Sequence, residues 1–145
     1  MSVPAPLDDQ LCFAVYGALQ ALTRRYRPLL AELGLTYPQY LVLLVLWRGD
    51  GLSVKALGER LDLDSGTLTP LLKRLEAAGL VARRRAAEDE RVVRVDLTDR
   101  GRALAEPAAA IGGRVFGACG FDLPALIDLR DELKALKAGL DRTTA

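Results

Sequence analysis

The part of the chain that most constrains its fold runs from Gly51 to Gly101. Its pattern is that of two short amphipathic helices joined by a turn and followed by a basic hairpin. Ser53 can cap the first helix, and Asp64 or Ser65 can cap the second, which is predicted to end near Ala78. The leucines of the second helix recur at helical spacing and form one apolar stripe. They are Leu68, Leu71, Leu72 and Leu75.

The hairpin consists of two predicted strands, Val81–Arg85 and Arg91–Leu97, on either side of a polar tip at Ala86–Glu90. Residues 71–102 carry nine Lys or Arg against six Asp or Glu, a net of +3, whereas the whole chain is only +1. Phosphate binding requires such a concentration of positive charge. The order of elements predicts a winged helix-turn-helix that binds duplex DNA. The same fold with a solvated basic hairpin could instead bind protein.

The outward face of the second helix offers side chains that suit DNA. Hydroxyl groups at a helix start suit base edges, and cations further along suit phosphates. The residues on this face are Ser65, Thr67, Thr69, Lys73 and Arg74.

The length of 145 residues leaves room for one domain with a real core, so we expect a single domain over 1–145 that is mainly α with a small β wing. No uncharged run approaches the roughly 18 residues that span a membrane, and no secretory signal is evident. Two cysteines together with an intracellular DNA target indicate a reducing compartment, which favours a cytoplasmic protein. We expect no cofactor, no metal site and no enzyme activity.

Helices are predicted before the winged segment, over about residues 7–48. The first is expected from Leu7 to Tyr26, with acidic residues in its first turn, and Pro28 is expected to interrupt the pattern. Thr36 is expected to cap a further helix that ends before Gly49.

Helices are also predicted after the winged segment of residues 51–98, over about residues 99–140. Thr98 is expected to cap one helix through roughly Ala118, and Leu123–Leu140 forms the last. The segment Ala103–Cys119 has only two charged residues, and a helix that is apolar on most sides must be covered. Burial between two subunits would cover it. A homodimer would also present two recognition helices to a two-fold DNA site.

These features together resemble the multiple-antibiotic-resistance regulator (MarR) family of dimeric winged-helix repressors. The resemblance is carried by LGERLDLDSGTLTPLLKRLEAAGLVARRRAAEDERVVRVDLTDRG. Within the family, the start of the chain is similar to the organic-hydroperoxide-resistance regulators (OhrR), through LDDQLCFAVYGALQALTRRYRPLLAELGLTYPQYLVLLVLW. The subfamily assignment depends on four residues together, and the match covers about residues 7–140. The four are Cys12, Tyr26, Tyr37 and Cys119.

The resemblance implies that Cys12 is the cysteine that a hydroperoxide oxidises to sulfenic acid. Thiolate is the reacting form, and the chain has no histidine to stabilise it. A helix N-terminus and tyrosine hydroxyls are the remaining means. Tyr26 and Tyr37 match the pair that hydrogen-bonds the sulfur, and Tyr16 could line the pocket. The alternative is ordinary packing, with a small core cysteine and stacked rings.

Tyr26 lies fourteen residues after Cys12. Along one continuous helix this is roughly 21 Å at about 1.5 Å per residue, so the two cannot touch within one helix. If Tyr26 stabilises the sulfur, it must come from the other subunit. The redox site would then exist only in the dimer.

Cys119 matches the second cysteine found in one branch of these regulators, and this implies a disulfide with Cys12 of the other subunit. Gly117 and Gly120 flank Cys119 and would let this helix end bend at modest cost. The alternative is an inert buried cysteine, in which case a small-molecule thiol would cap Cys12.

On DNA, the resemblance implies that Arg91 of the hairpin enters the minor groove and that Asp89 orients it. Arg74 and Arg85 are interpreted as phosphate contacts, which position the protein without specifying sequence. A merely solvated tip is the alternative for Arg91.

The sequence therefore predicts a homodimeric repressor that senses organic hydroperoxide and binds a roughly palindromic operator, with half-sites about one helical turn apart. Oxidation of Cys12, followed by bonding to Cys119, would re-pack the terminal helices and move the winged lobes. Two other classes stay open. One is a regulator of this fold that binds a phenolic ligand, with both cysteines incidental, and the other is a thiol peroxidase that turns over.

Overall fold

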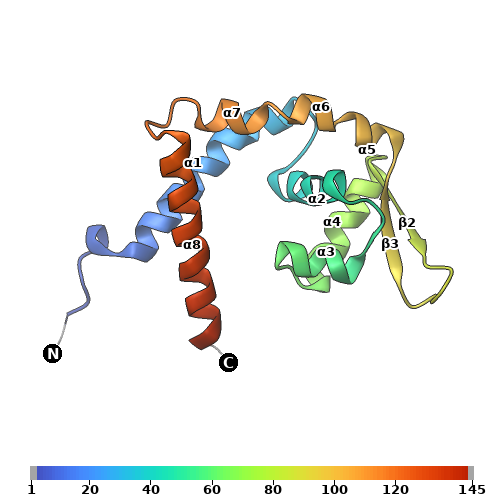
Figure 1. The fold of residues 1–145 in the computed structure, drawn as a ribbon, viewed down its shortest axis with the longest axis horizontal. Helices are drawn as coiled ribbons and strands as arrows, with labels where there is room; N and C mark the ends of the chain where they lie inside the picture. The colour runs from blue at the N-terminus through green and yellow to red at the C-terminus, as the bar shows by residue number, and fades with distance from the viewer. Residues whose placement is uncertain (1–2, 144–145) are drawn as a thin grey trace. The chain divides into compact units, whose positions relative to one another are not determined.

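The structure is a computed structural model that describes residues 3–143. The chain divides into two compact units, the first ending at Ile111 and the second beginning at Gly112. Each unit is described by itself. The elements follow the order shown in Figure 1.

The N-terminal helix α1 spans Leu11–Ala31, after a single 3-10 turn at Leu7–Asp9. The predicted start at Leu7 was therefore wrong. The predicted interruption was also wrong, because Pro28 lies inside α1. Proline removes only the hydrogen bond to the carbonyl four residues earlier, and the helix ends three residues after it. Burial of Leu30 holds this last turn in place.

Helix α2, Tyr37–Arg48, begins as predicted. The hydroxyl of Thr36 accepts from the amide of Gln39, whose side chain accepts from the amide of Thr36 in return. This reciprocal pair is a capping box, and it satisfies two amide groups at the helix start.

The winged helix-turn-helix follows with the predicted helices. Helix α3 spans Val54–Leu61 with Ser53 as its cap, and α4 spans Ser65–Ala77 with Asp64 as its cap. The four leucines predicted for the buried stripe of α4 are all buried, and together with side chains from α2 and α3 they form the centre of the core. The principal residues of this core are Leu43, Leu46, Leu57, Leu68, Leu71, Leu72 and Leu75.

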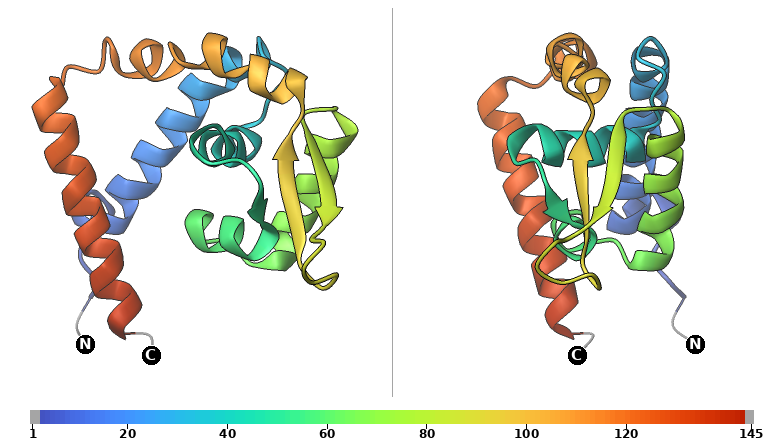
Figure 2. Two further views of the ribbon diagram at one scale, coloured as in Figure 1. Left: turned by 45° about the vertical axis from the view of Figure 1, so that its right-hand side comes forward. Right: turned by 90° about the vertical axis from the view of Figure 1, so that its right-hand side faces the viewer.

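The sheet has three antiparallel strands in the order β1-β3-β2. Strands β2, Val81–Arg85, and β3, Val93–Leu97, form the predicted hairpin, with β3 two residues shorter at its start than predicted. The unpredicted strand β1, Leu52–Ser53, pairs with the other edge of β3. In both views of Figure 2 the hairpin tip lies at the same end of this unit as the N-terminal end of α4.

After the sheet, Thr98 caps a helix as predicted, but the predicted continuous helix to Ala118 was wrong. The segment forms three short helices: α5 at Asp99–Ala103, α6 at Ala105–Ala108 and α7 at Ile111–Phe116. Pro107 has no amide hydrogen to donate to the carbonyl of Ala103, which is where the first helix ends. Two successive glycines lie at the start of the third helix, where they weaken it.

The second unit consists mainly of α8, Leu123–Thr143, which has no buried residue. Its large apolar side chains are exposed in the single chain. They are Leu123, Ile127, Leu129, Leu133, Leu136 and Leu140. Among the described helices, none combines the length and the hydrophobicity needed to cross a membrane.

Candidate functional site

The start of α4 presents the predicted hydroxyl groups to solvent. Asp64 accepts from the amide of Thr67 at 2.8 Å and so holds the first turn of the helix. Ser65 and Thr67 are exposed, whereas Thr69 is partly buried. Lys73 and Arg74, further along, are exposed, and the structure gives neither an ion-pair partner within residues 3–143. The whole predicted face consists of Ser65, Thr67, Thr69, Lys73 and Arg74.

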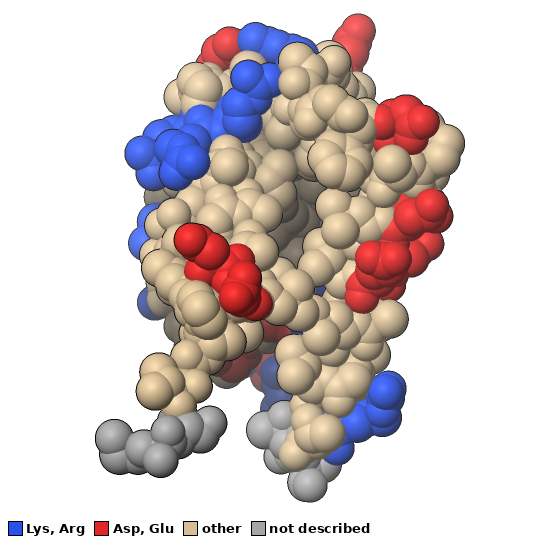
Figure 3. All heavy atoms as spheres, turned by 90° about the vertical axis from the view of Figure 1, so that its left-hand side faces the viewer, with Lys and Arg blue, Asp and Glu red and all other residues tan. Residues whose placement is uncertain are grey.

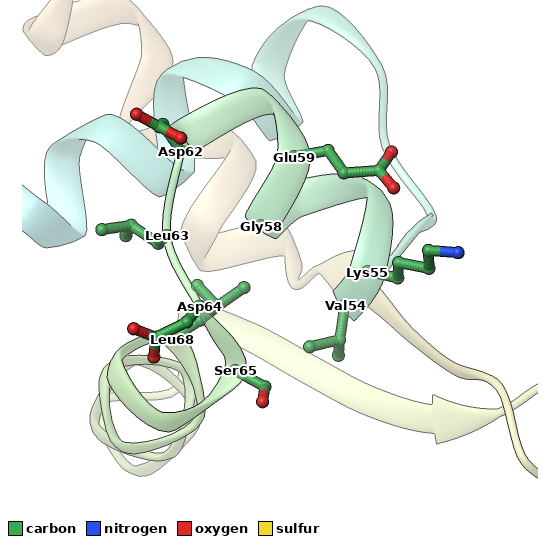
Figure 4. Close-up of a pocket in the computed structure, with 9 residues that line it drawn as sticks. All are labelled: Val54, Lys55, Gly58, Glu59, Asp62, Leu63, Asp64, Ser65 and Leu68. Atoms are coloured by element: carbon green, nitrogen blue, oxygen red, sulfur yellow. The ribbon is translucent and has the colours of Figure 1, made fainter. Parts of the chain in front are cut away.

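A shallow groove of about 500 Å³ runs between α3 and the start of α4 (Figure 4). Three carboxylates line it, from Glu59, Asp62 and Asp64, against a single lysine, Lys55. A lining with net negative charge repels phosphate. This lining does not suit an anionic ligand, whereas the outward face of α4 carries Lys73 and Arg74.

Besides Arg91 at the tip, which pairs with Asp89, three of the hairpin arginines are engaged in ion pairs within the unit. Arg83 pairs with Glu76 of α4, Arg84 with Asp96 of the neighbouring strand, and Arg94 with Glu88 at the tip. The sequence count of positive charge therefore overstates what DNA can meet. Since these pairs bridge strands and helix, their role is to hold the hairpin in its orientation.

Arg94 is a residue that the sequence analysis did not select. Its guanidinium donates to the carbonyl of Gly51 at 3.2 Å and to the carboxylate of Glu88 at 2.6 Å. The hydrogen bond from Arg94 lowers the pKa of Glu88, so this carboxylate stays ionised at neutral pH. One side chain thus connects the hairpin tip to the loop before β1. Only the tertiary structure reveals it, because the partners lie 43 and 6 residues away.

At the tip, Asp89 accepts three hydrogen bonds from Arg91. The backbone amide donates at 3.0 Å, Nε at 3.1 Å and Nη2 at 3.1 Å. The Arg91 side chain is 91% exposed. The side-chain hydrogen bonds, followed by the amide, lower the pKa of Asp89. This geometry is the one that the predicted orienting role of Asp89 needs. Arg85 lies beside it and donates to the carbonyl of Glu90 at 3.0 Å.

Cys12 is exposed and is the second residue of α1, in the first turn of a 21-residue helix. The amide groups of a first turn have no partners within the helix, and they carry partial positive charge. The flanking apolar side chains of α1 are exposed as well, and tan, which marks residues other than Lys, Arg, Asp and Glu, predominates in Figure 3. These exposed side chains are Leu11, Phe13, Val15, Tyr16 and Leu19.

The rings of Tyr26 and Tyr37 contact each other. Their ring centroids lie 4.9 Å apart, and Tyr40 contacts both rings, at 6.0 and 6.4 Å. Burial, followed by the neighbouring rings of Tyr37 and Tyr40, raises the pKa of Tyr26 to about 12. Its hydroxyl therefore keeps its proton at neutral pH and can donate a hydrogen bond.

The tyrosine pair does not meet the cysteine of its own helix. Cys12 and Tyr26 belong to the same continuous α1, so they are roughly 21 Å apart along its axis at about 1.5 Å per residue. Tyr37 contacts Tyr26 and therefore lies at the same far end of α1. Tyr16, one turn from Cys12, is exposed, and its hydroxyl accepts from the side-chain amide of Gln20 at 2.9 Å.

Cys119 lies between α7 and α8 in the second unit and is exposed. Its sulfur is 3.9 Å from the carbonyl oxygen of Phe121, and Gly120 has a φ of +82°. A non-helical connection rich in glycine can change its backbone at low cost. The cysteine is thus accessible, as a resolving thiol must be. Within residues 3–143, no cluster of side chains is arranged to hold a metal ion.

Comparisons with known proteins identify transcriptional regulators. Residues 24–107 match the family model of the transcriptional regulator SarA/Rot. The chain is 58% identical over 139 residues to the HTH-type transcriptional regulator TtmR of Methylorubrum extorquens, covering 91% of this chain and 71% of the relative. It is 52% identical over 111 residues to the organic hydroperoxide resistance transcriptional regulator of Bacillus subtilis, covering 77% of this chain and 76% of that protein.

Solved structures of AbfR, from Staphylococcus epidermidis, are similar over nearly the whole chain. Reduced AbfR bound to DNA matches with a TM-score of 0.82 and 34% identity, over 96% of this chain and 95% of that one. AbfR with its disulfide formed matches with a TM-score of 0.64 and 36% identity, over 94% of this chain and 91% of that one.

Proposed function

The chain belongs to the MarR family of winged-helix transcriptional regulators, with similarity to SarA/Rot and to organic-hydroperoxide-resistance regulators, and we propose that it is a homodimeric repressor released from DNA by organic hydroperoxide. The observation that carries this proposal is the placement of Cys12 and the tyrosine pair. In this proposal, a cysteine in the first turn of α1 and two tyrosines at its far end are complementary halves of one thiolate site.

Two copies of the chain would bring these halves together. If α1 of one subunit runs antiparallel to α1 of its partner, Cys12 of one meets Tyr26 and Tyr37 of the other, and the two-fold axis creates two equal sites. The exposed apolar side chains of α1 and α8 support this arrangement, since a monomer would leave them in water.

The chemistry at Cys12 is one oxidation followed by one condensation. The thiolate attacks an oxygen of the hydroperoxide, the O–O bond breaks, Cys12 becomes sulfenic acid, and the peroxide leaves as an alcohol after taking up a proton. The thiol of the partner subunit's Cys119 then attacks the sulfenic sulfur. A disulfide forms and water leaves. AbfR, which also forms a disulfide, supports this second step.

On DNA, the proposal assigns base contacts to Ser65, Thr67 and Thr69 and phosphate contacts to Lys73, Arg74 and Arg85. The exposed Arg91, held by Asp89, would enter the minor groove beside the major groove that α4 occupies. Since the N-terminal end of α4 and the hairpin tip lie at the same end of the unit, one DNA segment can meet both. AbfR, to which the chain is similar, has been solved bound to DNA, and this supports DNA as the partner.

The test is operator binding of the reduced protein before and after one equivalent of organic hydroperoxide, with recovery by reductant. We expect release from DNA for the natural chain and full retention for Cys12→Ser. A Cys12→Ser protein that is still released would favour the phenolic-ligand class of regulator. Cys119→Ser should retain sulfenic acid formation but lose the covalent dimer on a non-reducing gel.

A second measurement separates a regulator from a thiol peroxidase. We expect each Cys12 to consume about one equivalent of peroxide and then stop until reductant is added. Continuous consumption of many equivalents in the presence of a small thiol, at a rate suited to turnover, would support the enzyme class instead.

A further inference from the structure

Helix α2 carries a row of aromatic side chains on one face. Tyr37, Tyr40 and Trp47 are spaced by three and seven residues, which places them on the same side of the helix. Tyr40 is only 6% exposed and contacts both Tyr26 and Tyr37. Its other neighbour is Trp47, at a centroid distance of 6.3 Å and an interplanar angle of 66°. This edge-on contact lies within the range of favourable aromatic pairs.

Trp47 connects this row of rings to the segment that follows β3. Its indole Nε1 donates to the carbonyl of Gly101 at 2.9 Å, across 54 residues of sequence. Gly101 is buried, and a Cβ atom placed there would lie 2.1 Å from the carbonyl oxygen of Leu80. The backbone of Gly101 therefore packs directly on the backbone of Leu80. A shift of one requires a shift of the other.

The segment 98–101 holds the C-terminal end of the recognition helix α4. The hydroxyl of Thr98 donates to the carbonyl of Gly79 at 2.6 Å, and the Arg100 guanidinium donates to the carbonyl of Ala78 at 3.2 Å. The amide of Thr98 donates to the carbonyl of Leu80 at 3.1 Å. The carbonyl groups at a helix end need such partners. The orientation of α4 thus depends on the segment to which Trp47 is bonded.

We propose that Tyr40 and Trp47 are positioning residues that connect the Tyr26–Tyr37 pair to the C-terminal end of α4. The inference rests on the proposed function, because it gives the route from the thiolate site to the DNA-binding helix. When oxidation of the partner's Cys12 removes the acceptor of the two tyrosines, their rings move. Tyr40 moves with them because it packs on both, and Trp47 pulls or releases the carbonyl of Gly101.

A contiguous row of contacts becomes a mechanism only when coupling through it is measured. The first variant is Trp47→Phe, which keeps an aromatic ring beside Tyr40 but removes the N–H that bonds to Gly101. One hydrogen bond contributes about 0.5–1.5 kcal/mol. The loss of operator affinity that peroxide causes should therefore be roughly 2- to 12-fold smaller in Trp47→Phe than in the natural chain.

The rate of sulfenic acid formation at Cys12 is the second readout. A purely structural role of Trp47 would not separate this rate from release of the operator. Trp47 contacts neither Tyr26 nor Tyr37 among the ring pairs of the described chain. Trp47→Phe should therefore oxidise at the natural rate while its release from operator is impaired. Equal release of oxidised Trp47→Phe and natural protein would overturn the proposal.

Tyr40 offers a matched pair of variants. Tyr40→Phe keeps the ring that contacts Tyr26, Tyr37 and Trp47, so the peroxide response should be kept. Tyr40→Leu removes the ring and should reduce the response while the protein still folds and binds operator when reduced. A natural response in Tyr40→Leu, or an equal loss in both variants, contradicts the assigned role.

The natural chain provides a test without any substitution, because Trp47 is its only tryptophan. Oxidation should change the tryptophan emission with the same time course as release from DNA, and Cys12→Ser should show no change. Release without any change in emission overturns this inference alone. Absence of release in the natural chain would instead overturn the proposed function, so the two failures are distinguishable.

Discussion

The clearest quantitative prediction concerns Asp89, whose carboxylate orders the exposed Arg91 side chain before DNA is present. Asp89→Ala removes the three acceptor contacts at 3.0, 3.1 and 3.1 Å. An exposed ion pair of this kind contributes little to folding, so the fold should be unaffected. The freed arginine must instead be ordered when it enters the groove. Ordering a long side chain costs about 0.5–1.5 kcal/mol, which is roughly a 2- to 12-fold loss of affinity.

The assay is operator binding by fluorescence anisotropy at physiological salt, with Glu90→Ala as the matched control. Glu90 is an exposed acid in the same tip, so its removal changes the charge by the same amount without touching the Arg91 side chain. Removal of a negative charge near phosphate should raise affinity slightly. The expected result is weaker binding for Asp89→Ala than for Glu90→Ala, and a loss of roughly 1–3 kcal/mol for Arg91→Ala, typical of a groove contact.

A double-mutant cycle decides whether Asp89 acts through Arg91. In an Arg91→Ala background, Asp89→Ala should have no further effect beyond that of the Glu90→Ala control. Two results refute the reasoning: equal affinities of the two single acid variants, or a full Asp89→Ala loss in the absence of Arg91. Either would mean that the carboxylate does not orient the arginine for DNA.

Three further predictions follow from burial and packing. Gly101→Ala should lower the free energy of unfolding by about 1–3 kcal/mol in urea, because its Cβ would meet the carbonyl oxygen of Leu80 at 2.1 Å. Leu43→Ala, at a site that is 0% exposed, should cost about 2–5 kcal/mol in the same assay, and Leu44→Ala, at a site that is 39% exposed, should cost much less. Burial raises the pKa of Tyr26 to about 12, so stability should fall as pH rises from 10 through 12, because the unfolded chain loses this proton first. In thermal unfolding measured at a series of pH values, Tyr26→Phe should reduce the fall of the melting temperature over this range.

Local sequence patterns were sufficient to predict much of the structure of the winged helix-turn-helix. The cap Ser53, the leucine stripe of α4 and the hairpin were predicted from the sequence, and the structure confirms them; it also selects Asp64 over Ser65 as the cap of α4 and begins β3 two residues later than predicted. Each depends on interactions within a few residues: a side-chain oxygen with an amide three residues later, or apolar groups at helical spacing. The candidate roles of Cys12, Tyr26 and Tyr37 came from the family resemblance alone, since a lone cysteine carries no such local pattern.

Competing local preferences were resolved only by tertiary packing. Pro28 was predicted to interrupt the first helix, but burial of Leu30 keeps the turn around it helical. Pro107 was not considered, and the helix that should have continued to Ala118 breaks there. A proline costs one hydrogen bond in either place. Whether the helix continues depends on the apolar contacts that its next turn can make.

The connections between distant residues belong to the tertiary structure alone. Counting charges predicted a basic hairpin, but the fold pairs Arg83, Arg84, Arg91 and Arg94 with acids, and of these four side chains Arg91 at the tip is the most exposed. Trp47 hydrogen-bonds the carbonyl of Gly101, 54 residues away, and no sequence pattern indicated this contact. Sequence periodicity tells which side of an element is apolar. It cannot tell which distant group that side will meet, because this depends on how all the elements pack at once.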